Sequence, residues 1–64
     1  MNIIMKLWIA RDLDTTLKLH FEEPILFPAN NWISSSEKEL DPTLFPEVSF
    51  ENSPMEVKLK LIEK

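Results

Sequence analysis

His20 is the only histidine in this 64-residue chain, and it is the first candidate for acid–base chemistry. A catalytic histidine needs a nucleophile beside it and a third group that orients its ring. The hydroxyls of Ser34, Ser35 and Ser36 are available, but so small a domain has little room for a cleft that excludes water. The alternative is an exposed strand histidine opposite Trp8. The sequence favours this second interpretation and a protein that is not an enzyme.

Four oxygen-bearing residues have the spacing of a calcium-binding loop, namely Asp12, Asp14, Thr16 and Glu23. The sixth position of such a loop has to be glycine because the chain turns sharply there, and Leu17 occupies it. The chain has no cysteine, and one histidine with scattered carboxylates is a poor set of zinc ligands. Glycine is also absent, so the sequence has no glycine-rich phosphate loop. We expect no metal and no cofactor.

Alternating apolar and charged residues predict a strand at each end of the chain. Residues 55–62 read M-E-V-K-L-K-L-I, the period-2 pattern of a strand with one buried and one wet face. Residues 3–11 and 16–21 have related patterns, and the D-L-D-T-T segment between them predicts a hairpin. The best match is a three-residue loop that ends with Thr15 in the left-handed conformation. This register pairs Ile9 with Leu19 and Leu7 with Phe21.

Prolines divide the middle of the chain and argue against a long helix there. We expect Trp32 and Ile33 to begin a short strand or to pack as a plug, and residues 48–51 to form a short strand. Residues 34–37 have the spacing of a helix-capping box, so a short helix near Ser36, a hydrophilic loop and an edge strand all remain open. The related sequences P-I-L-F-P at 24–28 and P-T-L-F-P at 42–46 are interpreted as two apolar plugs.

The predicted fold is a single all-β domain over residues 1–64, a small, mostly antiparallel sheet or partial barrel of four to five short strands. An α+β fold with one short helix near Ser36 is the alternative. We expect the two terminal strands to be paired and the proline-rich middle to cover one face of the sheet. The predicted core is Leu7, Ile9, Leu19, Phe21, Val57, Leu59 and Leu61.

The outer face of this sheet is the candidate binding surface. Its residues are Lys6, Trp8, Lys18, His20, Lys58 and Lys60. An aromatic side chain among lysines on an open sheet is a common way to hold single-stranded nucleic acid. Alternatively, Trp8 packs beneath residues 24–50. The net charge of −4 argues against a general nucleic-acid binder.

Three stretches carry a resemblance to known proteins: K-L-W-I-A-R-D-L-D, E-E-P-I, and L-F-P-E-V-S-F-E-N-S-P-M-E-V-K-L-K-L. Together they resemble a group of small uncharacterised proteins of Bacteroides-type gut bacteria, some of them on prophages or other mobile elements. The resemblance covers more than half of the chain, but its motifs are structural and imply no chemistry. The resemblance also implies that other members of this group carry a glycine at the turn position that Thr15 occupies in this chain.

The chain is short enough that a partner surface would add to a marginal core. Its longest apolar run is residues 7–10, far below the roughly 20 residues of a membrane span. We therefore expect a cytoplasmic protein that does not enter membranes. The favoured function is a non-enzymatic interaction protein, with a homodimer formed through a strand edge or another small protein as partner. A single-stranded nucleic-acid accessory protein is the alternative, and a small enzyme or metal protein is the least favoured.

Overall fold

The structure is a computed structural model that describes residues 2–62, with side chains described for residues 5–58. Within that range it is all-β, as predicted, and contains no helix. Its strands are β1 (Asn2–Arg11), β2 (Leu17–His20), β3 (Ile25–Phe27), β4 (Asn31–Ile33), β5 (Glu37–Leu40) and β6 (Met55–Ile62). None of the described residues belongs to a helix long and apolar enough to cross a bilayer.

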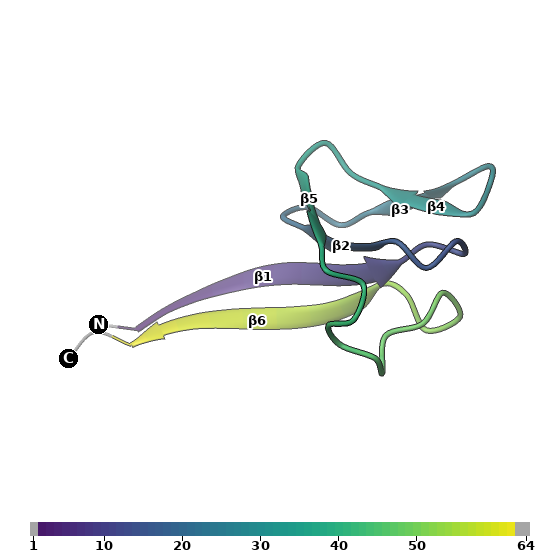
Figure 1. Cartoon of the computed structure of the whole chain (residues 1–64). Coiled ribbons are helices and arrows are strands. Elements are labelled where there is room, and N and C mark those ends of the chain that lie inside the picture. The colour runs from purple at the N-terminus through teal and green to yellow at the C-terminus, as the bar shows by residue number, and fades with distance from the viewer. Residues whose placement is uncertain (1, 63–64) are drawn as a thin grey trace.

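The strands form two antiparallel sheets rather than a barrel (Figure 1). The larger sheet has the order β5-β2-β1-β6, so the two terminal strands pair with each other and β1 is central. The smaller sheet is the β3–β4 hairpin. The described residues thus form six strands, where four or five were expected. The alternative of a helix near Ser36 is wrong because β5 begins at Glu37, and the predicted strand over residues 48–51 is a loop.

The β1–β2 turn has the predicted three-residue loop. The Thr15 amide donates to the Asp12 carbonyl at 2.9 Å, and the Asp12 amide donates to the Thr16 carbonyl at 2.8 Å. Thr15 is left-handed, with φ of 79°. Asp14 stabilises the turn by accepting a hydrogen bond from the Thr16 amide at 3.0 Å. The turn fixes the predicted register of Ile9 opposite Leu19.

One face of the larger sheet carries the apolar core. Ile9, Leu17 and Val48 are buried together, and the partly buried residues packed against them are Leu19, Leu40, Met55 and Val57. Val48 comes from the loop between β5 and β6, which covers this face (Figure 1). Phe21 is wrongly predicted as core, since its side chain is 44% exposed. The β1–β2 ladder ends at Trp8 and His20, one position before the expected Leu7–Phe21 pair.

Of the remaining predicted core residues, Leu7 is buried, whereas the side chains of Leu59 and Leu61 lie outside the described range. The β3–β4 hairpin covers the opposite face near the end of β1, as expected for the proline-rich middle. The hairpin and the β5–β6 loop are thus two covers on opposite faces of the sheet. They meet at Trp32 and Phe50, whose ring centroids are 6.4 Å apart.

The interpretation of the two P-x-L-F-P segments as plugs is wrong. Their large apolar side chains are about half exposed: Ile25 by 60%, Leu26 by 48%, Phe27 by 45%, Leu44 by 46% and Phe45 by 43%. Tight turns explain part of this result. Ala29 at the β3–β4 turn and Phe45 in the covering loop both have positive φ, so each segment reverses direction at the surface.

The first part of β1 extends beyond the rest of the sheet. β6 pairs with β1 from Asn2–Ile62 through Ile9–Met55, whereas β2 pairs only with residues 8–11 of β1. Residues 2–7 therefore have one neighbouring strand, and up to the buried Leu7 they form with β6 a two-stranded ribbon that projects from the body (Figure 1). This ribbon lengthens the molecule, whose principal extents are 43 × 23 × 17 Å.

Candidate functional site

The register places the predicted binding residues on one face of the larger sheet. The β3–β4 hairpin covers some of these residues and leaves others exposed. Lys6 pairs with Lys58 and both are exposed, while Trp8 pairs with His20 and is half-buried. Lys60 pairs with Ile4 through its backbone, and its side chain lies outside the described range. The exposed face is therefore smaller than expected.

Lys18 and His20 are wrongly predicted as exposed. The side chain of Lys18 is only 12% exposed and that of His20 is fully buried. Both lie at the end of the face that the β3–β4 hairpin covers. An alternating pattern predicts which face of the sheet a side chain lies on, but it cannot show whether another segment will cover that face.

Beneath the hairpin, Lys18 is the centre of a polar cluster. Its ammonium lies 3.2 Å from Asp12 Oδ2 and 3.4 Å from Glu37 Oε2. It also donates to the Trp32 carbonyl at 2.6 Å, while Asp12 Oδ1 accepts the Trp32 amide at 2.7 Å. Lys18 and Asp12 thus hold both polar groups of the Trp32 backbone, which fixes β4 over the sheet. Buried charges need such partners because losing water is costly.

The structure brings His20 against Ser34, one of the hydroxyls that the sequence offered as a nucleophile. His20 Nδ1 lies 2.8 Å from Ser34 Oγ. The Ser34 hydroxyl, however, donates its proton to the Ser36 carbonyl at 2.9 Å. It must therefore accept the hydrogen bond from Nδ1–H. A nucleophilic serine needs the reverse arrangement, in which histidine accepts the serine proton. This geometry orients the ring and leaves the hydroxyl without a base.

Burial, aided by the positive charge of Lys18, lowers the pKa of His20, although the carboxylates of Glu37 and Asp12 act in the opposite direction. The ring is therefore held neutral near pH 7, with its proton on Nδ1. Its Nε2 atom is buried and has no hydrogen-bond partner among the described residues. Protonation of His20 would bury a cationic N–H without an acceptor, which is strongly unfavourable.

Glu37 joins this cluster to the loop before β5. Burial acts against ionisation of its carboxyl group, but the Ser34 amide and the Lys18 charge outweigh this and lower its pKa. Glu37 Oε1 accepts the Ser34 amide at 3.1 Å. This is one of the two hydrogen bonds of a capping box, formed here at a turn that leads into a strand. The spacing of Ser34 and Glu37 was therefore a real local signal.

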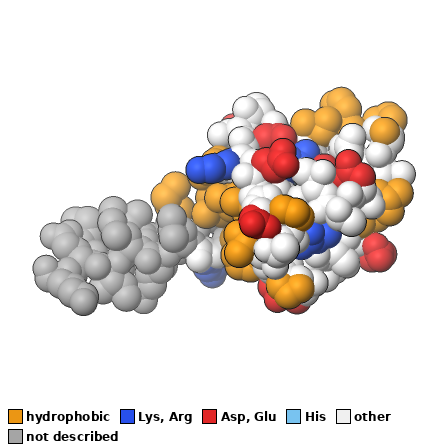
Figure 2. All heavy atoms as spheres, viewed as in Figure 1, with side chains coloured by type: hydrophobic (Ala, Val, Ile, Leu, Met, Phe, Trp, Pro, Cys, Tyr) orange, Lys and Arg blue, Asp and Glu red, His pale blue; other side chains and the backbone are white. Residues whose placement is uncertain are grey.

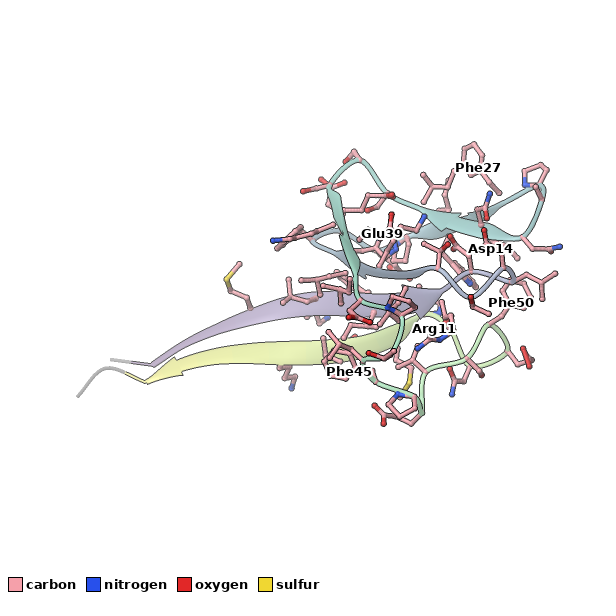
Figure 3. All side chains as sticks on the ribbon, viewed as in Figure 1. Arg11, Asp14, Phe27, Glu39, Phe45 and Phe50 are labelled. Atoms are coloured by element: carbon pink, nitrogen blue, oxygen red, sulfur yellow. The ribbon has the colours of Figure 1, made fainter. Side chains whose placement is uncertain are left out.

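Arg11 organises the cover on the apolar face and was missed in the sequence. Its guanidinium donates to five carbonyls, those of Val48 at 2.6 Å, Thr15 at 3.0 Å, Pro42 and Leu44 at 3.1 Å, and Phe45 at 3.2 Å. Figure 3 shows Arg11 among the turns of the β5–β6 loop. Only the planar, five-donor guanidinium can serve so many carbonyls at once. Four of these five carbonyls lie more than 30 residues away in the sequence, so no local pattern indicated the contacts.

Two of the uncovered surfaces in the described part of the chain are candidates for binding. The first is the outer edge of β6, because β6 is the last strand of its sheet and pairs only with β1. The second is the outer side of the β3–β4 hairpin, where Figure 2 shows hydrophobic side chains gathered at the surface. Phe27 projects there, away from the larger sheet (Figure 3). Exposed apolar groups and unpaired strand edges are both typical of protein interaction sites.

No protein-family model, curated protein or solved structure matches this chain.

Proposed function

We propose that this protein is a small, non-enzymatic interaction protein that pairs with a second copy of itself through the outer edge of β6. The observation that supports this proposal most strongly is the projecting ribbon formed by residues 2–7 and β6. An isolated two-stranded ribbon is marginally stable in water. A further strand beside β6 would complete the sheet and add the burial that the small core lacks.

The other strand edges are less suited to pairing. β5 has four residues, three of them the charged Glu37, Lys38 and Glu39. β3 has three residues and lies between Pro24 and Pro28, which cannot donate to a ladder. β6 has eight residues and contains no proline. Charged residues, short length and proline are the usual protections of an edge. β6 carries the charged residues Glu56, Lys58 and Lys60, but it is neither short nor interrupted by proline.

The charge pattern of β6 favours one register of a two-fold symmetric pair. In such a pair, opposed residues share a face, so the symmetry axis passes through a residue. An axis at Lys58 places Glu56 opposite the partner's Lys60, twice by symmetry, and places the two copies of Lys58 opposite each other once. An axis at Leu59 would instead place Lys58 opposite the partner's Lys60, twice. An axis at Val57 would place Glu56 opposite the partner's Lys58, but residues 60–62 would then have no strand residue opposite them. Opposite charges across strands are favourable and like charges are not, so we infer the axis at Lys58, which combines two opposite-charge pairs with a long overlap of the two strands.

Cross-linking of single-cysteine variants tests both the edge and the register, because the chain has no native cysteine. In the proposed pair, the two copies of position 58 lie about 4.5–5.5 Å apart between Cα atoms, a distance that suits a disulfide. The Lys58→Cys variant should form a covalent dimer rapidly on mild oxidation. Glu51→Cys, in the exposed loop before β6, is the control and should not.

The alternative registers give distinct results. Faster cross-linking of Leu59→Cys than of Lys58→Cys would support pairing through the β6 edge but would place the symmetry axis at Leu59. Equal and slow cross-linking of all β6 variants and Glu51→Cys would contradict pairing through β6.

Nucleic-acid binding is the weaker alternative. The net charge is −4, and two of its six proposed contact residues, Lys18 and His20, are covered. The absence of cysteine fits a reducing compartment, so we further expect the protein to act in the cytoplasm.

A further inference from the structure

The outer side of the β3–β4 hairpin holds a groove of about 460 Å³. Its floor is apolar and consists of Ile25, Phe27 and Ile33. Ile25 and Ile33 are directly opposed in the β3–β4 register, and Phe27 is two residues from Ile25 on the same face. Ile25 is 60% exposed and Phe27 is 45% exposed, so the floor is open to a ligand.

One rim of the groove is acidic. Glu22 and Glu23 lie directly before β3, and both are exposed. Glu22 accepts a hydrogen bond from the hydroxyl of Ser35, which is also in the groove wall, so its carboxylate is held in place. Neither glutamate forms an ion pair within the described range. The groove thus joins an apolar floor to two uncompensated negative charges.

We propose that this groove binds an extended peptide segment in which a bulky apolar side chain stands next to a lysine or arginine. The apolar side chain would cover Ile25 and Phe27, and the basic group would lie against Glu23. Charge complementarity selects this ligand over an acidic or purely apolar one. Recognition works through side chains, because Pro24 and Pro28 disfavour the addition of a peptide strand to β3.

The groove is separate from the proposed dimer edge. β6 lies at one end of the larger sheet, whereas the hairpin covers the other part of that sheet, around Asp12 and Lys18. Peptide binding and pairing through β6 can therefore occur together, and either can fail alone.

The test is an NMR titration of the ¹⁵N-labelled full chain with the capped peptide Lys-Phe-Ile-Arg. The capped peptide Glu-Phe-Ile-Glu, with the same apolar residues, is the control ligand. We expect saturable shifts of the Ile25, Phe27 and Ile33 amides with the basic peptide at millimolar concentration. Glu23→Gln should weaken binding by up to about fivefold, because an exposed ion pair contributes little more than this. The matched variant Glu51→Gln should bind like the parent.

Ile25→Ser removes part of the floor and should weaken binding by about five- to tenfold. The unbound spectra of all three variants report whether each fold is intact. Equal binding of the acidic peptide, shifts outside the groove, or no saturable shift would overturn the proposal. So would shifts of the same amides on concentrating the protein alone, which would make the groove a contact between copies of this chain.

Discussion

The two halves of β1 have very different surroundings. Residues 8–11 have a strand on each side up to Ile9, the β5–β6 loop over one face and the β3–β4 hairpin over the other. Residues 2–7 have only β6 beside them. The sequence pattern is similar in both halves, so alternation alone does not decide which half is covered. The difference comes from Arg11 and Asp12, which follow each other at the end of the covered half.

These two residues face opposite sides of the sheet, as successive strand residues do. Arg11 lies on the face of Ile9 and holds the β5–β6 loop through carbonyl groups. Asp12 lies on the face of Ala10 and holds the β3–β4 hairpin through the Trp32 amide. Each cover is thus fixed by a charged side chain. The projecting half has no such anchor in the described residues, which is why we place the partner there.

The largest expected effect comes from removing a core side chain in the covered half. Leu17 is fully buried, so Leu17→Ala should cost about 2–5 kcal/mol in the free energy of unfolding. Met5, in the projecting half, is 47% exposed, and Met5→Ala should cost less than about 1 kcal/mol. Urea unfolding followed by tryptophan fluorescence gives both values. Similar losses for the two variants would contradict the contrast between the halves.

The next largest effect should follow from Arg11→Lys, which keeps the charge but loses the planar fork. Lysine can serve only some of the five carbonyls, so we expect a loss of about 1–3 kcal/mol. Lys38→Ala, at an exposed position of β5, is the control and should change stability little. If Arg11→Lys unfolded at the same urea concentration as the parent, the loop would be held by apolar packing alone.

Much of the sheet could be predicted because its signals are local. The β1–β2 turn, the left-handed Thr15 and the opposition of Ile9 and Leu19 all follow from turn chemistry and alternation. The pairing of the two terminal strands was likewise expected. The turn at Ser34 and Glu37 shows the limit of such signals, since the predicted contact forms without the helix that usually accompanies it.

The covers could not be predicted because their contacts join residues far apart in sequence. Arg11 bonds to Val48, and Lys18 bonds to Trp32, with nothing in the local pattern to specify either pair. The burial of His20 follows from the second of these contacts. The exposure of Phe27 and Phe45 follows from tight turns at the ends of both covers, where an apolar composition alone suggested burial.

The hairpin cover should weaken in mild acid while the loop cover does not. The folded-state pKa of His20 lies below its ordinary value of 6.5, so the unfolded chain binds more protons as the pH falls below that value. Stability is therefore greatest above about pH 6.5 and falls as the pH drops toward the folded-state pKa. The melting temperature should decline over this range before Asp and Glu titrate.

Two measurements isolate the contribution of His20. The slope of melting temperature against pH should flatten between about pH 6.5 and pH 5 in His20→Phe. In the folded parent, the ring carbon signals should titrate below 6.5. A ring that titrates at or above 6.5 would show that the cluster favours the charged form.

The smallest effect should be a gain in stability at the β1–β2 turn. Thr15 has φ of 79°, a conformation that costs an ordinary residue about 1–2 kcal/mol and glycine almost nothing. Glycine loses more entropy on folding, so Thr15→Gly should give a net gain of about 0.5–1 kcal/mol. Thr43→Gly, at an exposed turn position without positive φ, should be destabilising. Equal losses at both positions would show that this turn relaxes in solution.

Sedimentation equilibrium over the micromolar range tests pairing through β6 most directly. The account predicts that the average mass rises from one chain toward two with concentration, and that the melting temperature rises with it. The Glu56→Lys variant, which would place like charges across the proposed axis, should dimerise more weakly, whereas Glu51→Lys should match the parent. A mass of one chain at every concentration, with a constant melting temperature, would contradict the proposed dimer.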